Sequence, residues 1–210
     1  MKVLELFAGS RSFSKVAEEL GMETFTTDIN PFYKIDYVSD ILNFDESKIP
    51  FKPDIIWASP PCTTFSIASC STHWTKDKIP KTKKCLQGIK MIEKTIEIIQ
   101  MLKPQVFYIE NPRGLLRKME FMNNDMFIRR TITYCQYGDN RMKPTDIWTN
   151  DKEWNPREMC KNGMPCHKSA PRGSRTGTQG LKDNYERSKV PAELCKEILK
   201  NILKHKKLKQ

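Results

Sequence analysis

Short runs of apolar residues alternate with amphipathic stretches along most of the chain. The apolar runs are rich in β-branched and aromatic side chains and are bounded by Gly, Pro, Asp or Asn, which is typical of β-strands. The predicted strands cover residues 2–7, 23–28, 36–41, 53–59, 105–111, 129–138 and 145–150. The last two lie close together in the sequence, and we expect them to pair as a hairpin.

Three stretches have the spacing of helices that bury one face. The first covers residues 12–20 and meets a natural stop at Gly21. The second covers residues 84–102 before Pro104, and its apolar stripe consists of Leu86, Ile89, Ile92, Ile96 and Ile99. The third covers residues 191–203, and its stripe consists of Leu194, Ile198, Leu199, Ile202 and Leu203.

The alternation of strands and helices predicts an α/β protein with a mostly parallel, seven-stranded sheet. Between residues 150 and 186 Gly and Pro become frequent and the periodicity disappears, which indicates an insertion or a long functional loop. We therefore expect a core at 1–149, a short segment at 150–186, and a C-terminal helix with a basic tail at 187–210.

Composition narrows the class of protein. The chain has 210 residues, of which 38% are hydrophobic and 29% charged, as in a single globular domain. No apolar run approaches the ~20 residues of a membrane span, and the N-terminal stretch does not have the pattern of a signal peptide. Seven cysteines at irregular spacing indicate a reducing compartment, so we expect a cytoplasmic monomer without disulfides.

The charge is strongly basic. The net charge is +11, which favours a polyanionic partner such as nucleic acid. Residues 187–210 contain eight Lys or Arg and two Glu, a net +6. A solvated, solubilising tail explains this run equally well, so charge by itself does not choose between the two interpretations.

Reactive side chains follow several of the predicted strands. They are Asp28, Asp40, Cys62, Glu110 and Asn111. Because ligands of open α/β sheets bind beyond the carboxyl ends of the strands, we expect these side chains to share one edge. A thiolate is a strong nucleophile, and a carboxyl group beside it can hold or donate a proton.

The loop after the first strand reads "FAGSRSFS". Its small residues would let a ligand approach the backbone, and the helix that follows offers its N-terminus. The loop lacks the G-x-G-x-x-G pattern of dinucleotide sites, so a plain strand-to-helix turn is the alternative.

Three motifs in this order, "LELFAGSRSFS", "SPPCTTFS" and "YIENPRG", resemble the DNA cytosine carbon-5 methyltransferase family. The resemblance covers residues 1–149 and, more weakly, 187–203. It implies the Rossmann-like methyltransferase fold, S-adenosylmethionine as cofactor and double-stranded DNA as partner. The short 150–186 segment suggests a small orphan enzyme of the kind found in phages and in restriction-modification systems.

The resemblance also implies a set of cofactor contacts. Asp28 would hold the ribose hydroxyls, and Asp40 and Ile41 would face the adenine. The implied set is Phe7, Ala8, Gly9, Ser10, Asp28, Ile29, Asp40, Ile41, Pro61, Ser188 and Val190. Ser10, Arg11 and Ser12 replace the glycine-rich part of the family's first loop, and Thr63 replaces the usual glutamine after the cysteine.

The family mechanism assigns Cys62 as the nucleophile that adds to carbon 6 of cytosine, and Glu110 as the group that binds ring nitrogen 3. A cytosine inside a duplex must be flipped out to be reached. The catalytic set implied by the resemblance also includes Asn111 and Arg141. Lys143 stands where the family has a second arginine and cannot make a planar bidentate contact. The alternative for Arg141 is a residue of a surface turn.

The remaining candidates concern nucleic acid and metal. The resemblance places DNA contacts at Ser66, Lys143, Arg172, Arg175, Thr176 and Gln179, although a polar loop without function is the alternative for the last four. Cys160, Cys166 and His167, with Cys135 or Cys195, invite a zinc interpretation. The spacing is not C-x2-C, and an adjacent Cys-His pair is a poor chelator, so we favour free thiols and expect no metal.

Two alternatives to a DNA methyltransferase stay open. An RNA or tRNA cytosine methyltransferase would use the same fold and the same cysteine chemistry. A DNA-binding protein that retains the fold without catalysis would not need both Cys62 and Glu110, and the presence of both residues favours an enzyme.

Overall fold

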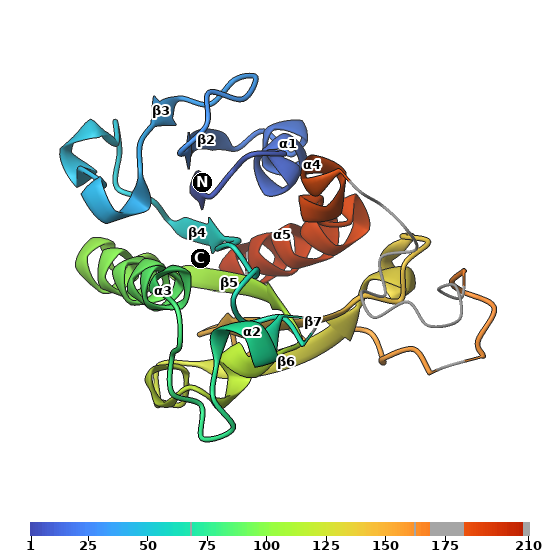
Figure 1. Cartoon of the computed structure of the whole chain (residues 1–210). Helices are drawn as coiled ribbons and strands as arrows, with labels where there is room; N and C mark the ends of the chain where they lie inside the picture. The colour runs from blue at the N-terminus through green and yellow to red at the C-terminus, as the bar shows by residue number, and fades with distance from the viewer. Residues whose placement is uncertain (68, 162, 169–182, 208–210) are drawn as a thin grey trace.

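The structure is a computed structural model that describes residues 1–67, 69–161, 163–168 and 183–207 (Figure 1). Its strands form one seven-stranded sheet in the order β3-β2-β1-β4-β5-β7-β6. The strands are β1 Lys2–Leu6, β2 Glu23–Asp28, β3 Tyr37–Val38, β4 Ile55–Ala58, β5 Val106–Pro112, β6 Ile128–Thr133 and β7 Pro144–Thr149. Strands β1 to β5 pair in parallel, and β7 pairs antiparallel with both β5 and β6. The predicted mostly parallel sheet and its hairpin are confirmed.

The α-helices are α1 Ser12–Glu19, α2 Cys70–His73, α3 Lys83–Leu102, α4 Asn184–Ser188 and α5 Ala192–Lys207. The three predicted helices correspond to α1, α3 and α5. Helices α2 and α4 are too short to show a hydrophobic period, and the sequence did not predict them. Short 3-10 helices are η1 Ile41–Asn43, η2 Glu46–Lys48, η3 Leu115–Lys118, η4 Glu120–Met122 and η5 Tyr134–Tyr137.

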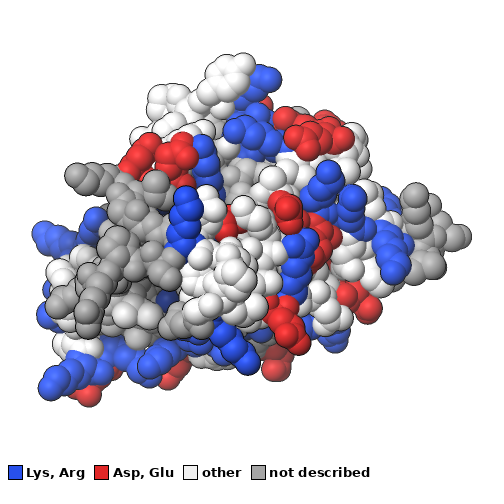
Figure 2. Space-filling model, turned by 90° about the vertical axis from the view of Figure 1, so that its right-hand side faces the viewer, with Lys and Arg blue, Asp and Glu red and all other residues white. Residues whose placement is uncertain are grey.

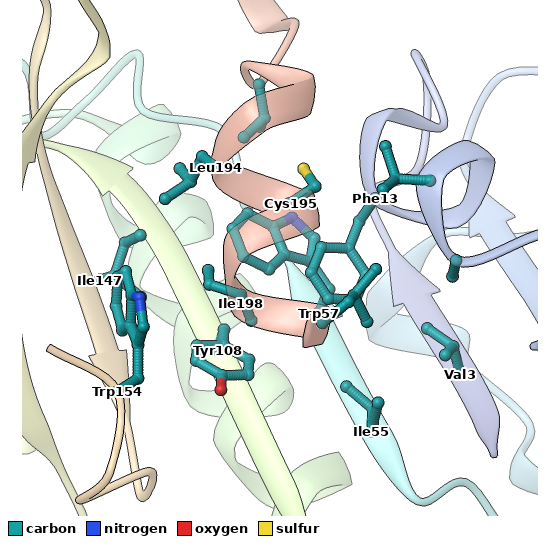
Figure 3. Packing of buried hydrophobic residues seen from close by; sticks show 14 of the residues in the cluster. Val3, Phe13, Ile55, Trp57, Tyr108, Ile147, Trp154, Leu194, Cys195 and Ile198 are labelled. Atoms are coloured by element: carbon teal, nitrogen blue, oxygen red, sulfur yellow. The ribbon is translucent and has the colours of Figure 1, made fainter. Parts of the chain in front are cut away.

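Helices cover both faces of the sheet, with α1 and α5 on one face and α3 on the other (Figure 1). Successive strand residues point to opposite faces, so Val3, Ile55 and Trp57 pack against α1 and α5. The rings of Phe13 and Trp57 stack there with their centroids 4.6 Å apart, next to Ile198 of α5 (Figure 3). The sheet is therefore buried on both sides, as its apolar strands require.

Two details of the sequence prediction were wrong. Leu86, which we expected to be buried, is 48% exposed. Cys85 lies two helical turns before the buried Ile92, so Cys85 and not Leu86 is on the buried face of α3. The predicted strand 129–138 ends at Thr133, where the chain turns into η5 and buries Tyr134 and Tyr137 on one side of a single turn.

A buried carboxylate fastens α1 to β1. Glu5 accepts hydrogen bonds from the backbone N–H groups of Phe13 (3.3 Å) and Ser14 (2.7 Å). Arg11, at the N-cap position, makes no side-chain capping bond, so Glu5 supplies the acceptors that the first turn needs. Burial raises the pKa of Glu5, and its hydrogen bonds to the helix oppose that shift. Because two amide groups of this turn are occupied, they are not available to bind a phosphate.

Replacing Glu5 with Ala should destabilise the fold by roughly 2–4 kcal/mol, because two buried amide groups lose their acceptor. Urea unfolding monitored by circular dichroism measures this loss. The matched control is Glu23→Ala, which removes an exposed carboxylate 3.7 Å from Lys2 and should change stability by about 0.5 kcal/mol or less. Equal losses in the two variants would contradict the role assigned to Glu5.

Candidate active site

A cleft opens at the carboxyl edge of β1 and β2. Its empty space of about 330 Å³ includes volume that is open to solvent. Six of the predicted cofactor residues line it, namely Phe7, Asp28, Ile29, Asp40, Ile41 and Pro61. The lining also includes Thr27, Ser39 and Met91, which the sequence did not indicate. Met91 belongs to α3, and a search of strand ends could not have found it.

The other predicted cofactor residues do not line this cleft, and most of them shape its loop. Gly9 donates its N–H to the Asp28 carboxylate (2.9 Å). The hydroxyls of Ser10 and Ser12 lie 2.7 Å apart, and Ser12 accepts the N–H of Val190 (3.1 Å). The first loop and the C-terminal segment are thus joined by hydrogen bonds.

The two residues left from that set differ in exposure. Ala8 is buried and donates its N–H to Thr27 (2.9 Å). Ser188 is exposed and its hydroxyl donates to the Tyr185 carbonyl (2.7 Å), so its contact with the cofactor stays a prediction.

The β1–α1 loop has a strained backbone. Phe7 (φ 58°) and Arg11 (φ 51°) both adopt the left-handed region, which is rare for residues with a side chain. A Cβ atom added at Gly9 would lie 3.1 Å from the ring of Phe32 and 3.4 Å from the Asp28 carboxylate. A side chain at position 9 would therefore crowd Phe32 and Asp28, and Arg11 accepts strain where the resemblance leads us to expect glycine.

The loop after β4 carries Cys62 and is held against the end of β5. Asn111 is fully buried and donates through Nδ2 to the carbonyl of Pro60 (2.9 Å). Leu115 donates its N–H to the Phe65 carbonyl (2.8 Å), and the absence of a side chain at Gly114 makes this approach possible. The position of the half-buried Cys62 is thus set by a strand about fifty residues later in the chain.

Glu110 lies in the same region and is only 4% exposed. Its Oε1 accepts a hydrogen bond from the Tyr134 hydroxyl (2.8 Å) and lies 3.8 Å from Nζ of Lys143. Lys143 Nζ also lies 4.5 Å from the centre of the Tyr134 ring, a cation–π contact. Three elements, β5, η5 and the start of β7, therefore bring a carboxylate, a phenol and an ammonium group together.

Electrostatics couple this cluster to the thiol. Burial raises the pKa of Cys62, the positive charge of Lys143 lowers it, and the negative charge of Glu110 raises it. Arg187 also lowers it. Burial and the charge of Glu110 therefore oppose formation of the thiolate, and the nearby cations favour it.

Arg141 lies inside the protein, which excludes the alternative of a surface turn. It is 5% exposed, and its Nε lies 2.9 Å and 3.0 Å from the two carboxylate oxygens of Asp139. It also donates to the carbonyls of Arg187 and Lys189, each at 3.4 Å. Arg141 thus ties the β6–β7 turn to the C-terminal segment, and its contact with substrate stays a prediction.

The predicted nucleic-acid residues are only partly described. Lys143 belongs to the cluster around Glu110, and the Ser66 hydroxyl lies 2.8 Å from that of Ser69. Arg172, Arg175, Thr176 and Gln179 lie outside the described residues. Figure 2 shows Lys and Arg side chains spread over one face with Asp and Glu among them, so this view has no single basic patch.

A family model for C-5 cytosine-specific DNA methylase matches residues 1–137. The chain belongs to this family. It is also 31% identical over 176 residues to a "Probable DNA (cytosine-5)-methyltransferase" of Frog virus 3 (isolate Goorha), covering 77% of this chain and 78% of that protein. The predicted class, a DNA cytosine methyltransferase, is confirmed at the level of the family.

Solved structures that are similar to the chain come from three organisms. They are a Spodoptera frugiperda DNMT2 mutant (19% identity, TM-score 0.47), S. pombe Dnmt2 methyltransferase (16%, 0.49) and Entamoeba histolytica methyltransferase EhMeth (14%, 0.48). The matches cover 73%, 73% and 76% of this chain, and 51%, 51% and 56% of the respective structures. The chain thus spans about half the length of these proteins.

Within the described residues, no helix has the length and apolar character needed to cross a membrane.

Replacing Lys143 with Gln should raise the pKa of Cys62, because the thiolate loses a neighbouring positive charge. We expect alkylation of Cys62 at pH 8 to slow by about two- to tenfold. Mass spectrometry of iodoacetamide-treated protein measures this rate at Cys62 alone. Lys152→Gln, at an exposed lysine, serves as the control for lost charge. An unchanged rate in Lys143→Gln would show that Lys143 does not act on the thiol.

Proposed function

We propose that the protein transfers a methyl group from S-adenosylmethionine to carbon 5 of cytosine in double-stranded DNA. The observation that carries this proposal is the convergence of Cys62 and Glu110 beside the Asp28 cleft, in a chain of the C-5 cytosine methylase family. The named DNA (cytosine-5)-methyltransferase among its relatives favours DNA over RNA.

The cleft suits S-adenosylmethionine in two respects. Asp28 keeps unshared electron pairs after binding Gly9 and Asn30, so its carboxylate can accept hydrogen bonds from ribose hydroxyls. Ile41 and Met91 also line the cleft and contribute apolar surface for adenine. Two amide groups at the start of α1 bind Glu5 and not a phosphate, and S-adenosylmethionine has no phosphate. When bound, it supplies an electrophilic methyl group on a sulfonium.

The reaction assigns separate tasks to the two buried groups. The Cys62 thiolate forms a bond to carbon 6, and the ring electrons move toward carbon 5 while Glu110 shares a proton with ring nitrogen 3. S-adenosylmethionine, held by Asp28 and the other cleft residues, would supply the methyl group for carbon 5. Loss of the carbon 5 proton to a base restores the ring double bond and releases Cys62 as thiolate.

Supporting residues hold this arrangement. Asn111 positions the Cys62 loop through Pro60, and its Oδ1 is buried without a hydrogen-bond partner among the described residues. A cytosine paired inside a duplex cannot reach Cys62, so the target base must be flipped out.

The proposed organisation of the chain follows from the same site. Residues 1–149 hold the cleft and the catalytic pair, 150–186 contact the DNA, and 187–210 close the cofactor side through Val190 and α5. All seven cysteines are free, which fits action in a reducing cytoplasm. We expect the protein to act as a monomer.

Conversion sequencing of DNA from cells that express the protein tests the proposal. We expect protected cytosines at a short recurring sequence, and none in cells that express Cys62→Ser, because that variant lacks the nucleophile. Sequencing the RNA of the same cells separates the substrates. If cytosines are protected in RNA and the DNA is unmodified, the substrate is RNA and not DNA. If both DNA and RNA are unmodified, the proposal that the protein is a cytosine methyltransferase is wrong.

The covalent step has its own measurement. Duplex DNA with 5-fluorocytosine at the target should form a denaturation-resistant adduct with the protein in the presence of S-adenosylmethionine. Release of Cys62 requires loss of a proton from carbon 5, and fluorine at that position blocks this step. Cys62→Ser should form no adduct. Methylated product without any adduct would contradict the covalent mechanism.

Replacing Asp28 with Asn should weaken S-adenosylmethionine binding about 10- to 100-fold, because charge-assisted hydrogen bonds to the ribose are lost. Isothermal titration calorimetry measures the change. Asp45→Asn, a carboxylate that binds Ser47 away from the cleft, is the control and should bind as wild type. If Asp28→Asn bound S-adenosylmethionine as tightly as the wild type does, Asp28 would not be part of the binding site.

A further inference from the structure

Four potential metal ligands meet at the end of the sheet opposite β3. They are Cys135, Cys160, Cys166 and His167, and their ligand atoms all lie within 4.8 Å of one another. Cys135 belongs to η5, and the other three belong to the segment that follows β7 (orange in Figure 1). The sequence suggested either Cys135 or Cys195 as the partner, and the structure places Cys195 in the hydrophobic core instead.

We propose that these four side chains form a structural zinc site. A tetrahedral zinc ion with bonds of about 2.3 Å to sulfur and 2.0 Å to nitrogen separates its ligand atoms by roughly 3.5–3.8 Å. The Sγ atom of Cys166 lies 3.8 Å from that of Cys135 and 3.7 Å from Nδ1 of His167. The Sγ atom of Cys160 lies 3.2 Å from that of Cys166 and 3.3 Å from Nδ1 of His167. The adjacent Cys-His pair, which we judged a poor chelator, does converge on one point.

The donor set selects the metal. Three thiolates and one imidazole are typical of structural zinc sites, and hard cations such as Mg²⁺ or Ca²⁺ prefer oxygen ligands. Four protein ligands complete a tetrahedron and leave no open position for a substrate. The site therefore suits a structural ion and not a second catalytic centre.

Backbone contacts around the cluster also bring its ligands together. The N–H of Cys160 donates to the Thr133 hydroxyl (2.8 Å), which fixes the first cysteine of the segment beside β6. Met164 donates its N–H to the Lys161 carbonyl (3.3 Å), and Gly163 has a φ of 85°. This turn sends the chain back, so that Cys166 and His167 reach the same point as Cys160. Gln136 Nε2 lies 3.4 Å from the Cys166 sulfur and can donate a hydrogen bond to it.

The site would fasten the segment after β7 to the turn that serves catalysis. Cys135 precedes Arg141 and Lys143 in the β6–β7 connection, and Lys143 lies 3.8 Å from Glu110. A second bond joins the same parts, because the N–H of Lys168 donates to the Asn140 carbonyl (3.0 Å). A zinc ion would thus join the proposed DNA-contacting segment to the catalytic cluster.

Metal analysis of the full chain, purified without chelators, tests the site. Inductively coupled plasma mass spectrometry should find about one zinc ion per chain. Cys166→Ser and His167→Asn should lose most of it, and Cys70→Ser, a half-exposed cysteine outside the cluster, should keep it. Cobalt substituted for zinc should give the visible absorption bands of tetrahedral thiolate coordination.

A second measurement needs no variant and so does not depend on the folding of one. Cys70 and Cys166 are both half-exposed, so without metal both should react with N-ethylmaleimide. In the purified protein Cys166 should react at least about tenfold more slowly than Cys70, and a chelator should remove the difference. Peptide mass spectrometry identifies the modified cysteine.

Three results would overturn the zinc site. They are a purified wild-type chain without zinc, a Cys166→Ser variant that retains as much zinc as Cys70→Ser, and a disulfide between Cys160 and Cys166. None of these results depends on methyltransferase activity, so the zinc site and the proposed function fail or stand separately.

Discussion

The hydrogen bond from Asn111 to the Pro60 carbonyl decides where the Cys62 thiol lies. Parallel pairing of β4 with β5 aligns Ala58, the last residue of β4, with Ile109, so the loop after β4 begins beside the last residues of β5. Asn111 then holds the proline-rich loop, and the negative charge of Glu110, one residue earlier, raises the pKa of the Cys62 thiol. Without this tether the loop that carries Cys62 would not be held against β5, the strand that carries Glu110.

The position of the antiparallel strand β7 brings Lys143 into the cluster around Glu110. Because β7 is inserted between β5 and β6, the residue before it, Lys143, returns to the end of β5 and meets Glu110. The same ammonium group lowers the pKa of a thiol whose burial raises it. Arg141, two residues earlier, binds Asp139 and two carbonyls of the C-terminal segment. The β6–β7 connection thus carries both Lys143, which lies next to Glu110, and Arg141, which binds the C-terminal segment.

On the side of the cleft, the buried carboxylate of Glu5 has a structural role. Glu5 occupies amide groups at the start of α1, and the strained loop before that helix places Phe7 in the cleft. The serine hydroxyls of that loop join it to Val190. Ser10 and Ser12, which depart from the glycine-rich family pattern, thus make specific hydrogen bonds.

The sequence by itself determined the strands, the three long helices and the candidates Cys62, Glu110 and Asp28, because hydrophobic period and strand ends are local properties. It could not place Lys143 at Glu110, bring Met91 into the cleft or distinguish Cys135 from Cys195 beside Cys160. These contacts join residues from different elements, and only the order of strands in the sheet brings them together. Leu86 shows the same limit in one helix, since the face that is buried depends on what packs against it.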